Sequence, residues 1–218
     1  MIKIEQRDAI KALSDYPDKF FDLCIADPPY GIGWGNVANN FKRKSSEKWK
    51  SPKEKFYTLK DWDNQRPEKS AFDDILRVSK KCIIWGGNYF TDLLPPSGGW
   101  LVWDKGVSEN MTLSKAELAW HNCKNSVDII KYLWSGFRKC EVVDRIHPTQ
   151  KPVKLYEFCI SKFSKPGDTI LDPYLGSGSS AIAAYRTRRA FVGYEIDEEY
   201  YTAAVKRLDK ERQQLKLF

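Results

Sequence analysis

TILDPYLGSGSSAIAAY, residues 169–185, decides the fold of this chain. The stretch begins with a short apolar run, turns at an Asp-Pro pair, passes two glycines and enters a run of small helix-forming residues. Gly176, Gly178 and Ala181 match the spacing G-x-G-x-x-A, and the acidic Glu195 follows about twenty positions later. A strand, a glycine turn, a helix and a distal acid together predict a nucleoside-binding βαβ unit, in which Glu195 accepts hydrogen bonds from ribose hydroxyls. The alternative for the glycines alone is a tight turn without a ligand.

The rest of the chain alternates between short apolar runs and helical patterns. Several of the runs are apolar at consecutive positions, as in strands that are covered on both faces. We predict helices over residues 153–163, 179–185 and 198–215. The predicted strands are residues 2–5, 21–26, 81–85, 100–103, 117–121, 128–133, 169–172 and 191–194. This alternation predicts an α/β fold with a doubly wound, mostly parallel sheet.

Composition narrows the class of protein. The 218 residues carry a net charge of +7, and 42% of them are apolar. That apolar share is enough for a folded core, and the positive charge favours polyanionic partners. No apolar run reaches the roughly 18 residues of a membrane span, so we expect a cytoplasmic protein that has no membrane contact. Five scattered cysteines without a C-x-x-C pair favour neither disulfides nor a zinc site, and we expect no metal.

A second informative loop, Asp27-Pro28-Pro29-Tyr30, follows the predicted strand 21–26. Ligands of open α/β sheets bind at the carboxyl ends of the strands, where this tetrapeptide lies. The prolines remove two N–H donors and stiffen the backbone. The Asp27 carboxylate and the Pro28 carbonyl can accept the two hydrogens of a planar amino group, while Tyr30 stacks on its ring. We therefore predict Asp27, Pro28, Pro29 and Tyr30 as catalytic residues, with an ordinary strand-ending turn as the alternative.

Residues 36–60 carry much of the positive charge. They contain eight lysines or arginines against two glutamates, and aromatic residues are interleaved with them. Cations neutralise phosphates and aromatic rings stack on bases, so the stretch is a candidate nucleic-acid contact. The alternative is a solvated surface loop. The candidate DNA-binding residues are Lys42, Arg43, Lys44, Lys48 and Trp49.

The glycine spacing does not choose between a dinucleotide and S-adenosylmethionine. A dinucleotide fold normally opens with its glycine loop, whereas here the loop comes late in the chain. The loop is also entered through Asp172, whose carboxylate suits an ammonium group. S-adenosylmethionine has such a group and dinucleotides do not, so S-adenosylmethionine is the favoured cofactor.

Four motifs in their chain order resemble one family. They are DPPY at 27–30, HPTQKP at 147–152, ILDPYLGSGSSA at 170–181 and FVGYEID at 191–197. Together they resemble the β-type, circularly permuted adenine-N6 methyltransferases of DNA, in which the catalytic tetrapeptide precedes the cofactor loop. The resemblance implies a Rossmann-like sheet of seven to eight strands and S-adenosylmethionine as the methyl donor.

The resemblance also implies roles for single residues. Asp8 would lie near the adenine of the cofactor and Glu195 at its ribose, while the segment from His147 to Lys151 would border its methionine end. The implied cofactor-binding residues are Asp8, His147, Thr149, Lys151, Asp172, Tyr174, Gly176, Gly178, Ser179 and Glu195. At position 174 the family more often has Phe, and the extra hydroxyl should not disturb packing against the cofactor.

The implied activity is site-specific methylation of adenine N6 in DNA, of the kind found in restriction–modification systems, on a base flipped out of the helix. Amino-methylation of cytosine N4 in DNA or of adenine in RNA stays an alternative. Rivals from other classes are a nicotinamide-dependent oxidoreductase and a non-catalytic DNA-binding subunit. We expect one domain over residues 1–218, with insertions at 36–67 and, as a minimal target-recognition region, at 107–145. Because these insertions are short, a homodimer or a partner recognition subunit could complete the DNA contacts.

Overall fold

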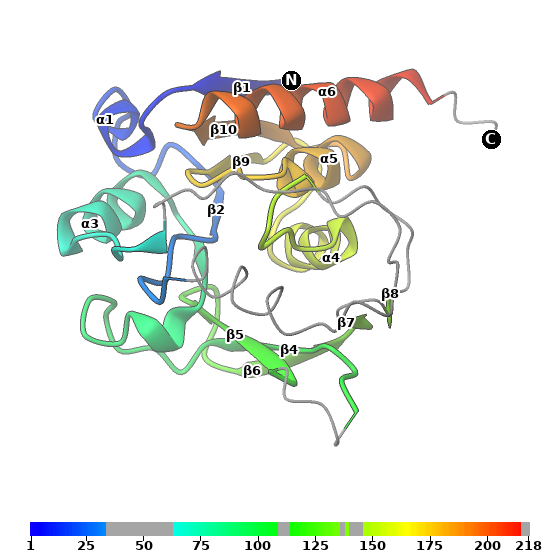
Figure 1. The fold of residues 1–218 in the computed structure, drawn as a ribbon. Coiled ribbons are helices and arrows are strands. Elements are labelled where there is room, and N and C mark those ends of the chain that lie inside the picture. Colours follow the sequence, from blue (N-terminus) through cyan, green and yellow to red (C-terminus); the bar gives the residue numbers. More distant parts are fainter. Residues whose placement is uncertain (34–62, 109–113, 136–137, 140–145, 215–218) are drawn as a thin grey trace. The chain divides into compact units, whose positions relative to one another are not determined.

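The computed structural model describes residues 1–33, 63–108, 114–135, 138–139 and 146–214 (Figure 1). The chain divides into two units, Met1–Pro28 with Glu68–Phe218, and Pro29–Pro67. The strands and helices named below all belong to the first unit. The five candidate DNA-binding residues, Lys42, Arg43, Lys44, Lys48 and Trp49, lie outside the described residues.

An eight-stranded sheet forms the centre of the first unit, in the order β1-β10-β9-β2-β3-β5-β4-β6. Its strands are β1 (Ile2–Gln6), β2 (Leu23–Ala26), β3 (Cys82–Trp85), β4 (Trp100–Asp104), β5 (Ala116–His121), β6 (Val127–Lys131), β9 (Thr169–Asp172) and β10 (Ala190–Glu195). All neighbours pair in parallel except β5, which runs antiparallel to β3 and to β4. The predicted doubly wound, mostly parallel sheet is therefore confirmed.

Helices cover both faces of this sheet. Figure 1 shows α1 (Ala9–Leu13) and α3 (Lys69–Val78) on one side of β2, and α4 (Val153–Phe163) and α5 (Ser179–Arg186) on the other. The long α6 (Glu198–Gln213) packs against α5, β1 and β10. A short 3₁₀ turn, η2 (Gly87–Tyr89), follows β3, and a two-stranded ribbon pairs β7 (Trp134–Ser135) with β8 (Arg138–Lys139).

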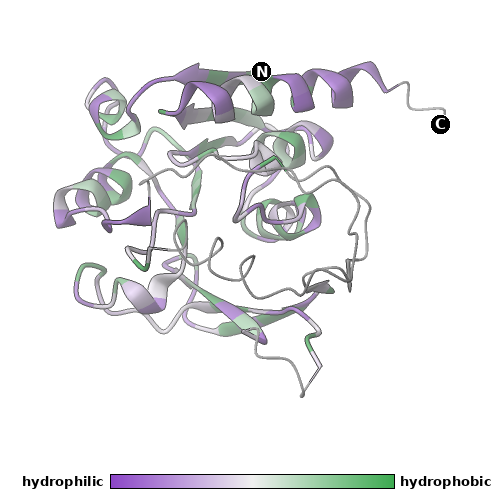
Figure 2. Ribbon diagram, in the orientation of Figure 1, coloured by the Kyte–Doolittle hydropathy of each residue, from purple (hydrophilic) through white to green (hydrophobic). Residues whose placement is uncertain are grey.

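The central strands are buried on both faces because every residue in them is apolar. All four residues of β2 and all four of β3 are buried, and α4 and α5 contribute apolar side chains to the same core. Figure 2 shows this contrast, with apolar strands inside and a largely hydrophilic α6 on the outside. At the end of the sheet, β6 alternates between exposed and partly buried residues, as expected of an edge strand.

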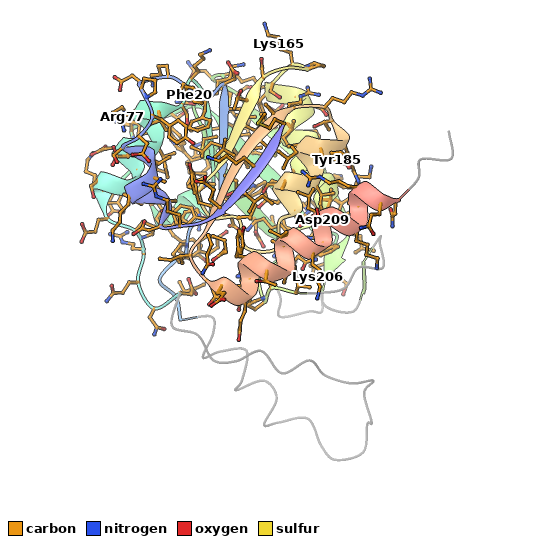
Figure 3. The ribbon with its side chains drawn as sticks, turned by 90° about the horizontal axis from the view of Figure 1, so that it is seen from above. Phe20, Arg77, Lys165, Tyr185, Lys206 and Asp209 are labelled. Atoms are coloured by element: carbon orange, nitrogen blue, oxygen red, sulfur yellow. The ribbon has the colours of Figure 1, made fainter. Side chains whose placement is uncertain are left out.

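An arginine joins the two helices on the α1 face. The Arg77 guanidinium, labelled in Figure 3, reaches from α3 to the turn after α1. It donates hydrogen bonds to the carbonyls of Leu13 and Tyr16 and to the carboxylate of Asp18. Because three acceptors from one turn meet a single planar donor, this contact fixes α1 against α3.

Most predicted elements agree with the structure to within two residues. The predicted helix 153–163 and strand 169–172 have the observed bounds, and β6 begins and ends slightly earlier than the predicted strand 128–133. The sequence analysis did not predict α1, α3 or the β7–β8 ribbon. Residues 107–145, the expected target-recognition insertion, include β5 and β6 of the main sheet.

Candidate active site

The predicted site residues follow strands that end at the same edge of the sheet. β9 lies between β10 and β2, and β1 pairs with β10, all in parallel. Asp172 and Glu195 are the last residues of β9 and β10, and Asp27 and Asp8 lie just after β2 and β1. The topology thus brings four carboxylates that are far apart in sequence to one edge, where ligands of such sheets bind.

The glycine loop has a backbone that only glycine adopts without strain. Gly176 and Gly178 have φ angles of +51° and +72°, and Gly178 caps the N-terminus of α5. A Cβ atom at Gly178 would lie 3.1 Å from the Cβ atom of Ala204 on α6. The loop is therefore packed closely between two helices, and both glycines are required by its geometry.

Asp172 is fully buried at the start of this loop. Its Oδ1 accepts a hydrogen bond from the backbone N–H of Tyr174 (2.9 Å), and its Oδ2 accepts one from the Ser180 hydroxyl (2.5 Å). Burial nevertheless raises the pKa of Asp172 to about 7, because it outweighs the two hydrogen bonds and the charges of Asp27 and Glu195 add to the rise. The structure thus holds a buried carboxylate that gains stability from a positive ligand nearby. Ser180 is a residue of this site that the sequence analysis missed.

Glu195 ends β10 and is held by backbone amides. Its two oxygens accept hydrogen bonds from the N–H groups of Gly176 (2.8 Å) and Asp197 (2.9 Å). Burial raises the pKa of Glu195, and these two hydrogen bonds act against that rise. The next residue, Ile196, is 70% exposed, so an apolar side chain stands in solvent beside the carboxylate.

The HPTQKP segment is anchored on the glycine loop. The His147 ring packs edge-on against the Tyr200 ring of α6 at 4.4 Å between centroids. Its Nδ1 accepts a hydrogen bond from the backbone N–H of Thr149 (3.3 Å) and lies 3.1 Å from the Thr149 hydroxyl. The Lys151 carbonyl accepts a hydrogen bond from the Ser179 hydroxyl at the start of α5 (2.8 Å). His147 and Ser179 thus lie at the glycine loop, and Thr149 is hydrogen-bonded to His147. Their roles in cofactor binding stay a prediction.

Arg207 of α6 reinforces the same loop, although the sequence analysis gave it no role. Its Nη1 donates to the Ser177 carbonyl and lies within hydrogen-bond distance of the Ser179 hydroxyl, both at 2.9 Å. In the sequence, Arg207 stands out only as a cation on the buried side of an amphipathic helix. That pattern does not predict which residues it contacts.

The Asp27 carboxylate pairs with a buried lysine. The Nζ atom of Lys151 lies 2.5 Å from Oδ1 of Asp27 and 3.4 Å from Oε2 of Glu117 on β5. The other oxygen of Glu117 lies 2.6 Å from Nζ of Lys105. Lys151 was predicted at the methionine end of the cofactor, and the structure places its ammonium group against the carboxylate of Asp27, which was predicted to be catalytic. Glu117 and Lys105 are further residues of the site that the sequence analysis missed.

The structure also describes two further predicted site residues, Asp8 in the first unit and Tyr30 in the second. Asp8 caps the N-terminus of α1 and accepts hydrogen bonds from the backbone N–H groups of Ile10 and Lys11. The pKa of Tyr174 is raised by burial and, to a smaller extent, by Cys24 and by the charge of Asp8. In the unit Pro29–Pro67, the backbone N–H of Tyr30 donates to the Asp63 carboxylate at 2.8 Å.

Other kinds of site have no support in the part of the chain that the structure describes. These residues contain no group of three or more His, Cys, Asp or Glu side chains that could hold a metal ion. Among the described helices, none combines the length and apolar character that crossing a membrane requires. The described site consists of carboxylates, lysines and a glycine loop.

Comparison with known proteins identifies the family. A family model described as DNA methylase matches residues 42–206. The chain belongs to this DNA methylase family. The type II methyltransferase M2.DpnII of Streptococcus pneumoniae is 29% identical over 94% of this chain and 89% of its own length. The type II methyltransferase M.HpaI of Haemophilus parainfluenzae is 26% identical over 94% of this chain and 73% of its own length.

Solved structures share the fold of this methylase. M1.HpyAVI in complex with S-adenosylmethionine has a TM-score of 0.56 and 23% identity, over 96% of this chain and all of the other chain. The cytosine-N4-specific PvuII DNA methyltransferase has a TM-score of 0.62 and 14% identity, over 97% of this chain and 90% of its own. The predicted Rossmann-like methyltransferase fold is confirmed by these similarities.

Proposed function

We propose that this DNA methylase transfers the methyl group of S-adenosylmethionine to the N6 amino group of adenine in DNA. The observation that carries the proposal is the position of Asp27, which follows β2 directly beside the β9 strand of the glycine loop. A hydrogen-bond acceptor for an amino group thereby lies at the same sheet edge as the candidate cofactor loop. The tetrapeptide DPPY supports adenine as the target, because its family resemblance is to the adenine-N6 enzymes.

The residues at this edge fit S-adenosylmethionine by the chemistry of their side chains. Asp172 offers a buried carboxylate to the ammonium group, and the N-terminus of α5 offers N–H groups to the carboxylate of the methionine part. Glu195 offers its carboxylate to the ribose hydroxyls, and the exposed Ile196 beside it offers an apolar surface to the adenine ring. When bound, the cofactor supplies a methyl group on a positively charged sulfur.

The side chains of this protein would act on the acceptor amino group. Its nitrogen is a poor nucleophile because its lone pair is delocalised into the ring. Hydrogen bonds from its two hydrogens to the Asp27 carboxylate and the Pro28 carbonyl localise that lone pair on nitrogen. Tyr30 stacks on the ring and orients the nitrogen, so proximity supplies a further part of the rate. The same carboxylate is placed to stabilise the positive charge that develops on nitrogen during the transfer.

DNA contacts complete the proposal. The target base must leave the stack to reach Asp27, at a cost of a few kcal/mol. The basic and aromatic residues from Lys42 to Trp49 are our candidates for binding the surrounding DNA and offsetting this cost. The proposal includes a homodimer or a partner recognition subunit that completes the DNA contacts, and a cytoplasmic location.

Methylation of cytosine N4 is the second candidate. It is supported by the family model, whose name covers N6 and N4 methylases, and by the fold shared with a cytosine-N4-specific enzyme. Chemically, Asp27 and Pro28 could hold either base, because both bases present a planar amino group on a ring.

Product analysis tests the proposal. The purified protein is incubated with S-adenosylmethionine and either double-stranded DNA or RNA, and the digested nucleosides are separated by mass. We expect N6-methyladenine from DNA. N4-methylcytosine would establish the second candidate. Methylated RNA without methylated DNA would mean that the substrate is RNA and not DNA. The absence of any methylated nucleoside would overturn the proposal.

A further inference from the structure

Four charged side chains of alternating sign form a continuous chain through the candidate active site. Asp27, Lys151, Glu117 and Lys105, which we call the ion-pair chain, are joined by N–O distances of 2.5, 3.4 and 2.6 Å. They come from the loop after β2, the segment before α4, strand β5 and the end of β4. Only Asp27 and Lys151 belong to motifs that the sequence analysis singled out.

Lys151 is the buried member of this chain. Its side chain is 5% exposed, and its Nζ lies 5.7 Å from the centre of the Trp85 ring. Burial alone would lower the pKa of Lys151, but the charges of Asp27 and Glu117 outweigh it and raise that pKa. The ammonium group is therefore kept charged between two carboxylates, each of which competes for its hydrogens.

Glu117 is ionised for a similar reason. Burial alone would raise its pKa, but Lys151 and Lys105 outweigh burial and lower it. The second lysine fixes one carboxylate oxygen, so the other oxygen faces Lys151 in a defined direction. Other titratable groups close to the chain are Tyr156, whose pKa is raised well above its usual value by burial, and the buried Asp172.

We propose that Glu117 is a positioning residue for methyl transfer, which acts through Lys151 to set the orientation and the acceptor strength of the Asp27 carboxylate. This inference rests on the proposed role of Asp27. With Glu117 present, Lys151 divides its charge between two carboxylates, so Asp27 is held in place and still accepts hydrogen bonds strongly. Without it, a larger share of the charge of Lys151 falls on Asp27, which weakens that carboxylate as an acceptor for the amino group of the base.

The test is a double-mutant cycle on turnover. We expect Glu117→Gln to lower kcat by about tenfold, while the KM and the calorimetric Kd for S-adenosylmethionine stay within about twofold of wild type. Glu117→Asp, which keeps the charge, should recover most of kcat. In a Lys151→Met background, Glu117→Gln should have no further effect on kcat, because the residue through which it acts is gone.

A matched control is Asp128→Asn. Asp128 lies on the edge strand β6, which is separated from β5 by β4, and it is likewise paired with two lysines, Lys124 and Lys162. It should leave kcat unchanged. Cofactor binding by each variant reports that it is folded, and if Lys151→Met does not bind cofactor, Lys151→Gln replaces it in the cycle.

Three results would overturn the inference. They are an unchanged kcat in Glu117→Gln, equal losses of kcat on both sides of the cycle, or a loss that Glu117→Asp does not recover. The underlying function is checked separately with Asp27→Ala. If that variant is inactive while Glu117→Gln behaves as wild type, only the inference fails, and if Asp27→Ala stays active, the proposed function itself fails.

Discussion

The candidate active site holds its carboxylates in two different ways. At the glycine loop, Asp172 and Glu195 are held by backbone N–H groups and a serine hydroxyl. At the ion-pair chain, Asp27 and Glu117 are held by lysines. The pKa values follow this division, because burial raises those of Asp172 and Glu195, whereas the lysines lower that of Glu117.

This difference fits the ligands that each region is proposed to receive. Neutral N–H and hydroxyl groups fix a carboxylate in place but do not balance its negative charge. The glycine loop therefore favours a cation such as the ammonium group of S-adenosylmethionine. Lysines balance the charge as well, so the ion-pair chain can receive a neutral base without an unpaired buried charge. The same sheet edge could therefore bind both a charged and a neutral ligand, because its carboxylates are bound by N–H and hydroxyl groups in one region and by lysines in the other.

The largest effect is expected from Asp27→Ala. It removes the acceptor for the amino group, and methyl transfer should fall by at least about a thousandfold, while calorimetric binding of S-adenosylmethionine survives. Asp22→Ala is the matched control, because Asp22 precedes the other end of β2 and pairs with Lys80. Near-normal turnover in Asp27→Ala would refute the idea that the ion-pair chain receives the base while the glycine loop receives the cofactor.

A smaller effect is expected from Glu195→Ala. The change removes the proposed acceptor for the ribose hydroxyls and releases the Gly176 N–H, so we expect the Kd for S-adenosylmethionine to rise by about thirty- to a hundredfold. Turnover at saturating cofactor should change much less. A variant with unchanged affinity but low kcat would show that Glu195 belongs with the ion-pair chain in function.

Asp172 should give the protein a pH-dependent stability. Its native pKa is about 7, whereas an unfolded aspartate releases its proton near pH 4. The native state therefore binds more protons between these values, and this contribution to the free energy of unfolding falls as the pH rises from about 4 to 7. One proton accounts for a slope of at most about 1.4 kcal/mol per pH unit. Asp172→Asn should flatten the slope in urea unfolding, and an unchanged slope would assign it to other groups.

The smallest effect is expected from Arg207→Met. It removes hydrogen bonds to the Ser177 carbonyl and the Ser179 hydroxyl, which should lower stability by about 1 kcal/mol and cofactor affinity by a few fold. Arg212→Met on the same helix loses only an exposed pair with Asp209 and should change neither. Equal effects from the two variants would mean that Arg207 contributes only as part of the helix surface.

The sheet was predictable because its strands are short, apolar and punctuated by turns. The glycine loop and DPPY were predictable because each is contiguous in sequence and directly follows a strand. By contrast, α1 has only five residues, too few for a periodic pattern. The helical pattern of α3 was present, with apolar residues at 71, 72, 75 and 78. It was not predicted as a helix because it directly follows the stretch 36–67, which was interpreted as an insertion.

The ion-pair chain could not be predicted from spacing. Asp27, Glu117 and Lys151 are widely separated in sequence, and they meet only because β5 runs antiparallel beside β3. That strand order is a property of the whole sheet, and the sequence gives no local sign of it. For the same reason, the ammonium group of Lys151 was predicted at the cofactor and not on Asp27.

The pairing of β1 with β10 has a consequence for biosynthesis. Ile2 finds its partner only at Phe191, and β2 lies against β9, which is also late in the chain. β1 therefore stays unpaired, and β2 pairs with β3 on one side only, until most of the chain has been translated. Such long-range pairing slows folding and leaves strand edges exposed to aggregation in the meantime, so the nascent chain should benefit from chaperones until its last third emerges.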